Sequence, residues 1–564
     1  MRKYGKHSLK MGFTFERMQY DVLSKVRQNG DFRFNATTVT PFENFLTNHP
    51  AQALLLSPSV RGEVGSRDSL FGLYIQDDFR MKSNLTLNLG LRYEILTNPS
   101  EAHGKFGLLN SIYAPAGSGP CPNVFPKAFG PTNVPGCTVP VGSMWQTNPT
   151  TRNFDPRLGF SWDPFHDGKT AVRGGFGIFD VLPLPYVYTI GDSLTYPFSL
   201  SFSQQGLPAG SFPNVLPFIN PTAPGTRWVD PHPHRSYAMN WNLNVQRQIT
   251  PNLSAQIGYV GSHVLHNAFT TDDSNQVIAK LVNGEYFWPL PQGSGTIADP
   301  NSAFIRPIFF DGTSKYNGLQ AQLAVRGLYG FQAQGAYTWG RCISDGDGAQ
   351  LGDPYQNSLS SLIFFDKPGS RRGPCDFDIR QNLSVNYLYS LPGSNTDSSL
   401  RWVVGGWQVG GIITASTGVP FTVVTGGDPL GQNSSDQFDY PNRAAGCNPI
   451  NSSFKSTANL TYLNASCFSI AAPTANGIVM GNNGRNQLYG PKLVDVDFSI
   501  IKNTAFPRTS DAFNMQLRFE FFNLFNHTNF QAPLDNNTLG GSLGQIDATT
   551  TTSRQIQLGL KFIW

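Results

Sequence analysis

Residues 84–95, which read NLTLNLGLRYEI, decide the fold. From Leu85 to Tyr93 every second position is leucine or tyrosine, whereas the positions between them, Thr86 to Glu94, are polar or glycine. Successive side chains of a β-strand point to opposite faces, so this order gives one apolar face and one polar face. The stretch therefore predicts an extended strand that has apolar surroundings on one face and water on the other.

The same period of two recurs along the whole chain, in about fourteen segments that are mostly longer than the strands of soluble proteins. Their approximate spans are 7–19, 70–80, 84–96, 154–163, 170–180, 236–249, 252–262, 315–327, 330–340, 378–391, 402–415, 493–503, 512–525 and 553–564. Strands of this length fit a tilted crossing of a bilayer, which needs about 9–11 residues. No segment has the roughly 18 consecutive apolar residues of a transmembrane helix. Because only helices and closed sheets satisfy their backbone groups in hydrocarbon, we expect an all-β, antiparallel transmembrane β-barrel.

Short and long connectors alternate between these segments. Turns such as 80–84 and 249–252 are short, whereas 97–153, 181–235 and 416–492 are long and rich in Gly, Pro, Ser and Asn. A compact soluble domain rarely holds unstructured loops longer than about 15 residues, and a propeller would repeat regularly, every 40–50 residues or so. Outer-membrane barrels combine short periplasmic turns with long extracellular loops. We expect this asymmetry, with outer-membrane lipid around the strands.

The composition agrees with a wall between lipid and water. Charged residues make up 14% of the chain, against about 25% in soluble proteins. A net charge of +4 without a cluster of Lys and Arg excludes a nucleic-acid partner. Aromatic residues near the strand ends would form interfacial girdles; they are Tyr74, Trp162, Trp241, Tyr259, Trp339, Tyr389 and Trp407.

Several blocks of sequence resemble one protein family. LYIQDDFR at 73–80, followed by 84–94, is similar to a strand pair of TonB-dependent outer-membrane receptors. The blocks that resemble the Oar-like branch of that family are DPRLGF (155–160), VRGGFGIF (172–179), GYVGS (258–262), YTW (337–339), GNNGRN (481–486) and RFEFFNLFNH (518–527). The last strand carries Phe562 and ends on Trp564, and it resembles the C-terminal signal that the outer-membrane assembly machinery reads.

The resemblance implies a barrel of about 22 strands around a plug, with an N-terminal TonB box that engages the TonB complex. Members of the Oar-like branch also carry a carboxypeptidase-regulatory-like domain. Residues 1–564 supply about fourteen strands, and neither the regulatory-like domain, the plug nor the TonB box is recognisable. Residues 1–7 are basic but lack an apolar signal-peptide region. We therefore expect a partial barrel domain, a fragment of a bacterial outer-membrane receptor.

The implied function is TonB-dependent uptake of a large or scarce ligand. Loops 181–235 and 263–314 are rich in aromatic residues and Asn, which suit stacking on a glycan or a peptide. An outer-membrane adhesion or export scaffold, whose loops bind surface polymers, stays open as the alternative. The polar strand positions would form a lumen-facing wall; they are Arg92, Glu94, Arg173, Gln246, Gln320, Gln322, Arg518, Glu520, Gln555 and Gln557.

Six cysteines fall in or beside the long loops as three local pairs: Cys121 with Cys137, Cys342 with Cys375, and Cys447 with Cys467. An even count suits an oxidising compartment, and six cysteines allow fifteen connectivities. We expect local disulfides, each stabilising its loop by roughly 3–4 kcal/mol. Free thiols are the alternative.

Signatures of catalysis and metal binding are missing from the sequence. There is no phosphate loop or His-Glu-x-x-His motif, so we expect no enzyme and no cofactor. His232, His234, His263 and His266 lack a carboxylate pattern that completes a metal site. The Asp345 to Asp347 stretch lacks the closing Glu of a calcium loop, so no metal site is predicted.

Overall fold

The computed structural model describes residues 2–24, 29–34, 40–56, 62–113, 121–122, 133–134, 138–182, 201–218, 225–270, 273–345, 368–392, 401–433, 438–505, 513–533, 536–538 and 541–564. Within these ranges almost all regular structure is β-strand, which confirms the all-β prediction. The helices there are short, namely α1 (Pro41–Leu46), α3 (Arg401–Val404) and single 3-10 turns. None of these described helices is long and apolar enough to cross a membrane.

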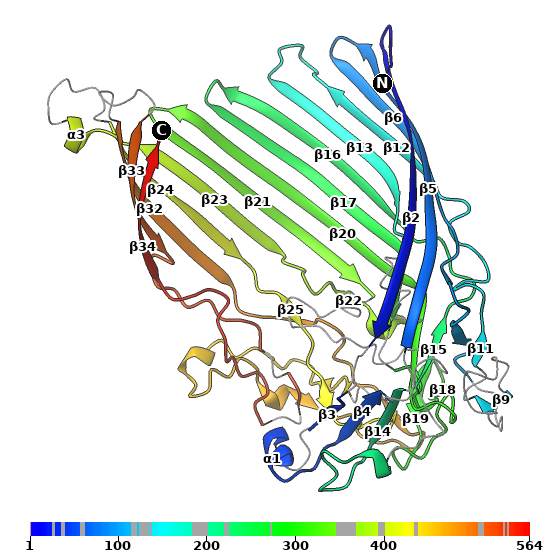
Figure 1. Cartoon of the computed structure of the whole chain (residues 1–564). Helices are drawn as coiled ribbons and strands as arrows, with labels where there is room; N and C mark the ends of the chain where they lie inside the picture. Colours follow the sequence, from blue (N-terminus) through cyan, green and yellow to red (C-terminus); the bar gives the residue numbers. More distant parts are fainter. Residues whose placement is uncertain are drawn as a thin grey trace.

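One large sheet of 18 strands dominates the molecule (Figure 1). Fourteen of its strands are long: β2 (His7–Ser24), β5 (Gly62–Lys82), β6 (Leu85–Leu96), β12 (Phe154–Trp162), β13 (Thr170–Asp180), β16 (Tyr237–Thr250), β17 (Leu253–Thr270), β20 (Ile305–Leu328), β21 (Phe331–Ser344), β23 (Gln381–Ser390), β24 (Trp407–Ser416), β32 (Leu493–Ala505), β33 (Asn514–Phe522) and β34 (Gln555–Ile563). Each long strand pairs antiparallel with the next one in the chain. The short members are β1 (Arg2–Tyr4), β7 (Ser100–Glu101), β15 (Thr226–Val229) and β22 (Gly373–Pro374).

The register gathers the apolar side chains on one face of the sheet. Leu89 lies opposite Leu158, and Leu87 lies opposite Phe160. This face is unusually exposed: the relative exposure of Leu558, for example, is 69%. Soluble monomers rarely expose large contiguous apolar patches, whereas strands of an outer-membrane barrel present such a band to lipid.

The sheet is curved and open across the described residues. At one edge β34 pairs with β33, and at the other edge the outer side of β2 pairs with the short β1 alone. Figure 1 shows β34 and β2 at opposite sides of the sheet. Backbone groups at a membrane depth need hydrogen-bond partners, so both edges call for a further strand when the sheet lies in a bilayer.

The connectors divide between the two ends of the strands. Short connections, such as those between β5 and β6 or between β16 and β17, lie at the end that also carries both chain termini (Figure 1). The long connections lie at the other end, as predicted. In an outer-membrane barrel the short turns lie on the periplasmic side and the long loops outside the cell.

The long loops fold into a layer with its own small sheets, which the sequence pattern did not predict. These sheets join β3 (Asp31–Arg33), β4 (Gln52–Leu56) and β14 (Ser201–Gln205); β8 (Gly107–Leu109) and β11 (Thr138–Pro140); β18 (Lys280–Val282), β19 (Glu285–Trp288) and β30 (Ile478–Val479); β25 (Pro420–Phe421) and β31 (Leu488–Tyr489); β26 (Thr425–Gly426) and β27 (Phe438–Asp439); and β28 (Asn442–Arg443) and β29 (Phe468–Ser469). We call this region the loop layer.

The buried hydrophobic cores of the molecule lie in and beside the loop layer rather than along the sheet. One cluster packs around Trp145 and Phe310, and another packs around Phe421 and Leu463. Their burial removes apolar area from water and gives the loops a stability of their own. The loop layer is thus a folded surface that can hold side chains in fixed positions.

Candidate functional site

The ten residues predicted to line a lumen all lie on one face of the sheet. The strand registers carry this face from Arg92 on β6 across to Gln557 on β34. Gln246 lies opposite Gln256, which in turn lies opposite Gln322. Arg173 donates to Gln246 Oε1 at 3.0 Å. The face is therefore a hydrogen-bonded polar wall, and its contact with a lumen stays a prediction.

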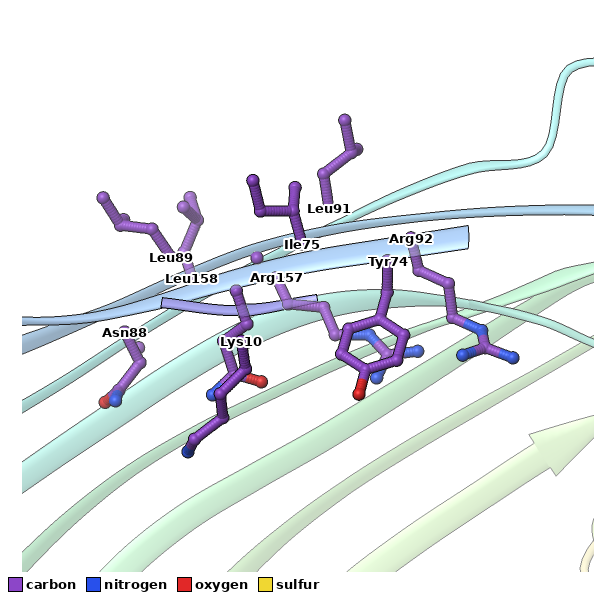
Figure 2. Close-up of a pocket in the computed structure, with 12 residues that line it drawn as sticks. Lys10, Tyr74, Ile75, Asn88, Leu89, Leu91, Arg92, Arg157 and Leu158 are labelled. Carbon is purple, nitrogen blue, oxygen red and sulfur yellow. The ribbon is translucent and has the colours of Figure 1, made fainter. Parts of the chain in front are cut away.

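Figure 2 shows how sharply the two faces differ around β5, β6 and β12. Leu89, Leu91 and Leu158 extend to one side of the sheet, whereas Asn88 and Arg92 extend to the side on which the other strands lie. The polar wall is thus the concave side of the sheet. We use "concave wall" for this face below.

Tyr74 corrects one detail of the predicted aromatic girdles. It lies opposite Arg92 in the register and points from the concave wall (Figure 2), so its assignment to the lipid-facing girdle was wrong. The reason lies in the alternation of β5 itself, because Phe71, Leu73 and Ile75 occupy the apolar face. Gly12 on β2 leaves room for the ring, since a Cβ there would lie 2.3 Å from it. The register places the other six predicted girdle residues on the apolar face.

A hollow of about 460 Å³ lies beside Lys10, Arg92 and Arg157. Lys10 Nζ lies 2.8 Å from Asp78 Oδ2, and Asp78 Oδ1 accepts from Asn88 Nδ2 at 2.7 Å. These bonds link three adjacent strands by side chains alone. The lining also includes the apolar Ile75, Leu89 and Leu158, so the hollow combines cationic and apolar groups and indicates no particular ligand.

The GNNGRN block ties together two long loops. The Arg485 side chain is 4% exposed, and its Nη2 donates to Ser344 Oγ at 2.6 Å and to Ser344 O at 2.9 Å. Asn486 Nδ2 donates to Asp376 Oδ1 at 2.7 Å. Gly373 allows the approach, because a Cβ there would lie 2.3 Å from Arg485 O. This buried network fixes loop 416–492 against the loop after β21.

A second set of polar contacts connects the same loops to the residues just before β23. Tyr489 Oη donates to Asp378 Oδ2 at 2.6 Å, and Arg380 lies 2.6 Å from the same carboxylate. Cys342 N donates to Asp378 Oδ1 at 2.6 Å. Burial, together with the hydrogen bond to Asp378, raises the pKa of Tyr489 to about 12. The contacts of Asp376 with Asn486 and of Asp378 with Tyr489 leave no sequence signal, since each pair is separated by more than a hundred residues.

The cysteines reinforce the same loops. Disulfides join Cys342 to Cys375 and Cys447 to Cys467, with Cα separations of 5.3 and 5.6 Å. Cys137 lies outside the described residues, so the pairing of Cys121 with Cys137 stays a prediction. The first disulfide lies directly beside the Arg485 network, because Arg485 Nη2 also donates to Pro374 O at 3.3 Å.

The histidines and the Asp345 stretch make structural contacts. The rings of His234 and His266 lie 5.0 Å apart, and His232 Nδ1 lies 2.8 Å from Thr147 Oγ1. Asp345 accepts from Thr313 Oγ1 at 2.6 Å, and Asp347 lies outside the described residues. Among the described side chains, the one group of three or more acidic, His or Cys residues close enough for a metal ion does not include these residues.

Residues 2–557 match a family model described as "Outer membrane beta barrel domain". The chain belongs to this family. As an outer membrane beta barrel protein, it resides in the bacterial outer membrane, and its exposed apolar face lies against lipid. No curated protein matches the sequence.

One solved structure shares the fold at low sequence identity, and others are similar at lower TM-scores. The outer membrane transporter YddB from Escherichia coli is 10% identical with a TM-score of 0.50, covering 100% of this chain and 52% of YddB. The FrpB iron transporter from Neisseria meningitidis is 12% identical, with a TM-score of 0.44 and coverage of 100% and 53%. The ferripyoverdine receptor of Pseudomonas aeruginosa is 11% identical, with a TM-score of 0.42 and coverage of 99% and 46%. All three are named as transporters or receptors, and this chain spans about half their length.

Proposed function

We propose that this chain forms the barrel wall and the ligand-capturing loop layer of a TonB-dependent outer-membrane receptor. The receptor takes up a large or scarce ligand. The observation that carries the proposal is a folded loop layer, fixed by the Arg485 network and two disulfides, above a continuous polar wall. Capture needs fixed side chains outside the membrane, and passage needs a hydrated path through it. Residues 1–564 supply wall strands in this proposal, and the plug, TonB box and Oar-like regulatory domain belong to the whole receptor.

The loop layer offers one cleft that suits a glycan or a peptide. Its volume is about 210 Å³, and Tyr286, Arg372, Tyr440 and Asn482 are among its lining residues. Aromatic faces stack on sugar rings or peptide side chains, and amide and guanidinium groups supply directional hydrogen bonds. The cleft lies between β19 and the GNNGRN block, so the same network that fixes the loops also shapes it.

Uptake and adhesion differ in their need for energy. We would measure the binding and uptake of a panel of labelled oligosaccharides and peptides by cells that carry the receptor, with and without a protonophore. A TonB-dependent receptor binds in both conditions and internalises the label only in energised cells. Label that stays at the surface regardless of energy would contradict uptake and support the adhesion or export scaffold.

Two matched variants locate the binding surface. Tyr286→Ala removes an aromatic ring from the cleft and should weaken binding at least tenfold. Tyr329→Ala removes a ring that is 91% exposed in the turn between β20 and β21, at the opposite end of the wall, and should leave binding unchanged. Equal binding by both variants and the wild type would place the ligand elsewhere.

A further inference from the structure

The middle of the concave wall is a broad surface without a charged side chain. It spans the six strands β16, β17, β20, β21, β23 and β24, which pair in this order (Figure 1). Every second residue of each strand faces the wall. These wall positions lie within residues 240–248, 254–264, 314–324, 332–342, 382–390 and 408–416, and across these described ranges none of them is Asp, Glu, Lys, Arg or His. We call these wall positions the uncharged panel.

The same strands do carry charge, but on their other face. Arg247, Lys315 and Arg341 occupy the alternate positions, so they lie on the side opposite the panel. Arg326 follows the register shift at the turn after β20 and lies outside the panel. The lack of charge is therefore a property of the wall face of these strands and not of their overall composition.

Charged side chains return to the wall on both flanks of the panel. Arg157 on β12 and Arg173 on β13 face it on one side, and Asp497 on β32 and Glu520 on β33 face it on the other. At about 4.8 Å per strand, the six strands between them give a width of roughly 29 Å. A neutral ligand on this surface displaces no water from a fixed charge, so it avoids a large desolvation cost.

The panel presents amide groups in place of charges. Each of its strands contributes at least one, for example Asn242, Gln256, Gln322, Gln334, Asn386 and Gln408 in chain order. The side chains of Gln320, Gln334 and Asn386 are exposed and make no hydrogen bond to another described residue. An amide offers both donors and an acceptor, as a sugar hydroxyl does, so amides in rows can bind the hydroxyls of a glycan. Tyr316 is the single aromatic residue among the panel positions, which leaves little to hold the side chains of a peptide.

The cleft in the loop layer lies over the middle of the panel. Arg372, which lines the cleft, donates through Nη1 to Thr313 Oγ1 at 3.0 Å and lies 3.1 Å from Asp345 Oδ1. Thr313 belongs to β20 and directly precedes the panel, and Asp345 directly follows β21. These two strands are the central pair of the six. A ligand that moves from the cleft toward the membrane therefore meets the uncharged panel.

We propose that the uncharged panel guides a neutral oligosaccharide from the cleft along the concave wall. The inference rests on the proposed function, because movement along the wall presupposes an uptake receptor, and it narrows the ligand to oligosaccharides without acidic or amino groups. Hydrogen bonds to one row of amides can exchange for bonds to the next row. An ion pair is stronger and would hold the ligand in one place, whereas passage needs many weak sites.

The test is isothermal titration calorimetry of the full chain, folded in detergent micelles. The probes are maltohexaose and xylohexaose, which are neutral, hexagalacturonate, which is acidic, and an uncharged Gly-Ser hexapeptide with blocked ends. At least one neutral sugar should bind, and about tenfold or more tightly than hexagalacturonate and the peptide. Binding of neither neutral sugar, or equal or tighter binding of the acidic sugar or the peptide, would overturn the proposal. This comparison uses the wild type, so it does not depend on the folding of a variant.

Matched variants locate the binding on the panel. All of them carry Tyr286→Ala, so that binding in the cleft does not mask binding to the wall. Adding Gln320→Ala, Gln334→Ala and Asn386→Ala together removes three exposed amides and should weaken binding of the neutral sugar about tenfold. Adding Gln555→Ala and Gln557→Ala removes amides from the same wall on β34, outside the panel, and should leave binding unchanged. Equal binding by both would overturn the proposal.

The outcome is separable from that of the uptake experiment. Binding in micelles needs no energy, so the panel can be confirmed even if cells hold the label at their surface. Energised uptake of a sugar whose binding ignores the panel variants would overturn this inference alone and leave the proposed function intact.

Discussion

The disulfide between Cys342 and Cys375 should decide whether the loop layer stays folded. It closes a segment with a sequence separation of 33 residues. In the chain-entropy relation this closure stabilises the folded loops by about 3.7 kcal/mol, so its removal should raise the population of locally opened loops by roughly 500-fold. The disulfide between Cys447 and Cys467 spans 20 residues and should contribute slightly less, about 3.3 kcal/mol.

Native-state proteolysis measures this opening directly, because cleavage reports the population of the open loops. We would compare wild type, C342A/C375A and C447A/C467A after folding in detergent. Both double variants should be cleaved in the loop layer hundreds of times faster, while heat-modifiable migration of the wall stays unchanged. Cleavage rates within about threefold of wild type, or loss of the folded wall, would refute the reasoning that the disulfides act locally on the loops.

The remaining predictions concern the network, a buried acid and the lipid face. Arg485→Ala leaves buried acceptors unpaired, so the free energy of opening of the loop layer, measured by hydrogen exchange, should fall by about 3–5 kcal/mol. A loss below about 1 kcal/mol would contradict the role of Arg485 in holding the loops together. Burial, and then the Asp428 carboxylate, raise the pKa of Asp439 well above its usual value. The native loops therefore hold a proton on Asp439 that the unfolded chain loses above about pH 4, so the stability of the loops should fall as pH rises from there. Proteolysis rates measure this fall, and the variant Asp439→Asn should make them less dependent on pH. The same pH dependence in the variant and the wild type would contradict the prediction. In lipid bilayers, Leu558→Arg should lower the free energy of unfolding by about 2–4 kcal/mol, and Gln557→Arg should lower it by about 0–1 kcal/mol. Urea unfolding measures both values, and equal losses would argue against two distinct faces.

The wall could be predicted because its signal is local. Alternation over ten residues, as in Leu85 to Glu94, sets both the strand and its two faces without knowledge of any other segment. The antiparallel order followed from the connectors, since short turns force neighbours to pair. Tyr74 was misassigned on its aromatic ring and its place near a strand end, whereas alternation with Phe71, Leu73 and Ile75 puts it on the polar face.

The loop layer and its contacts could not be predicted, because they depend on residues far apart in the chain. The strands of the loop layer are only two to five residues long, too short for a period to register. The GNNGRN block was visible, but Ser344 and Asp376 are separated from it by more than a hundred residues.

Spin labels placed one at a time at positions 85–94 of β6 test the central claim most directly. In lipid bilayers, labels at 85, 87, 89 and 91 should collide with oxygen dissolved in the lipid, and labels at 86, 88 and 92 should collide with a water-soluble nickel chelate. This alternation of period two follows from an apolar face in lipid and a polar concave wall in water. Uniform access of the nickel chelate at all these positions would contradict a membrane-spanning wall.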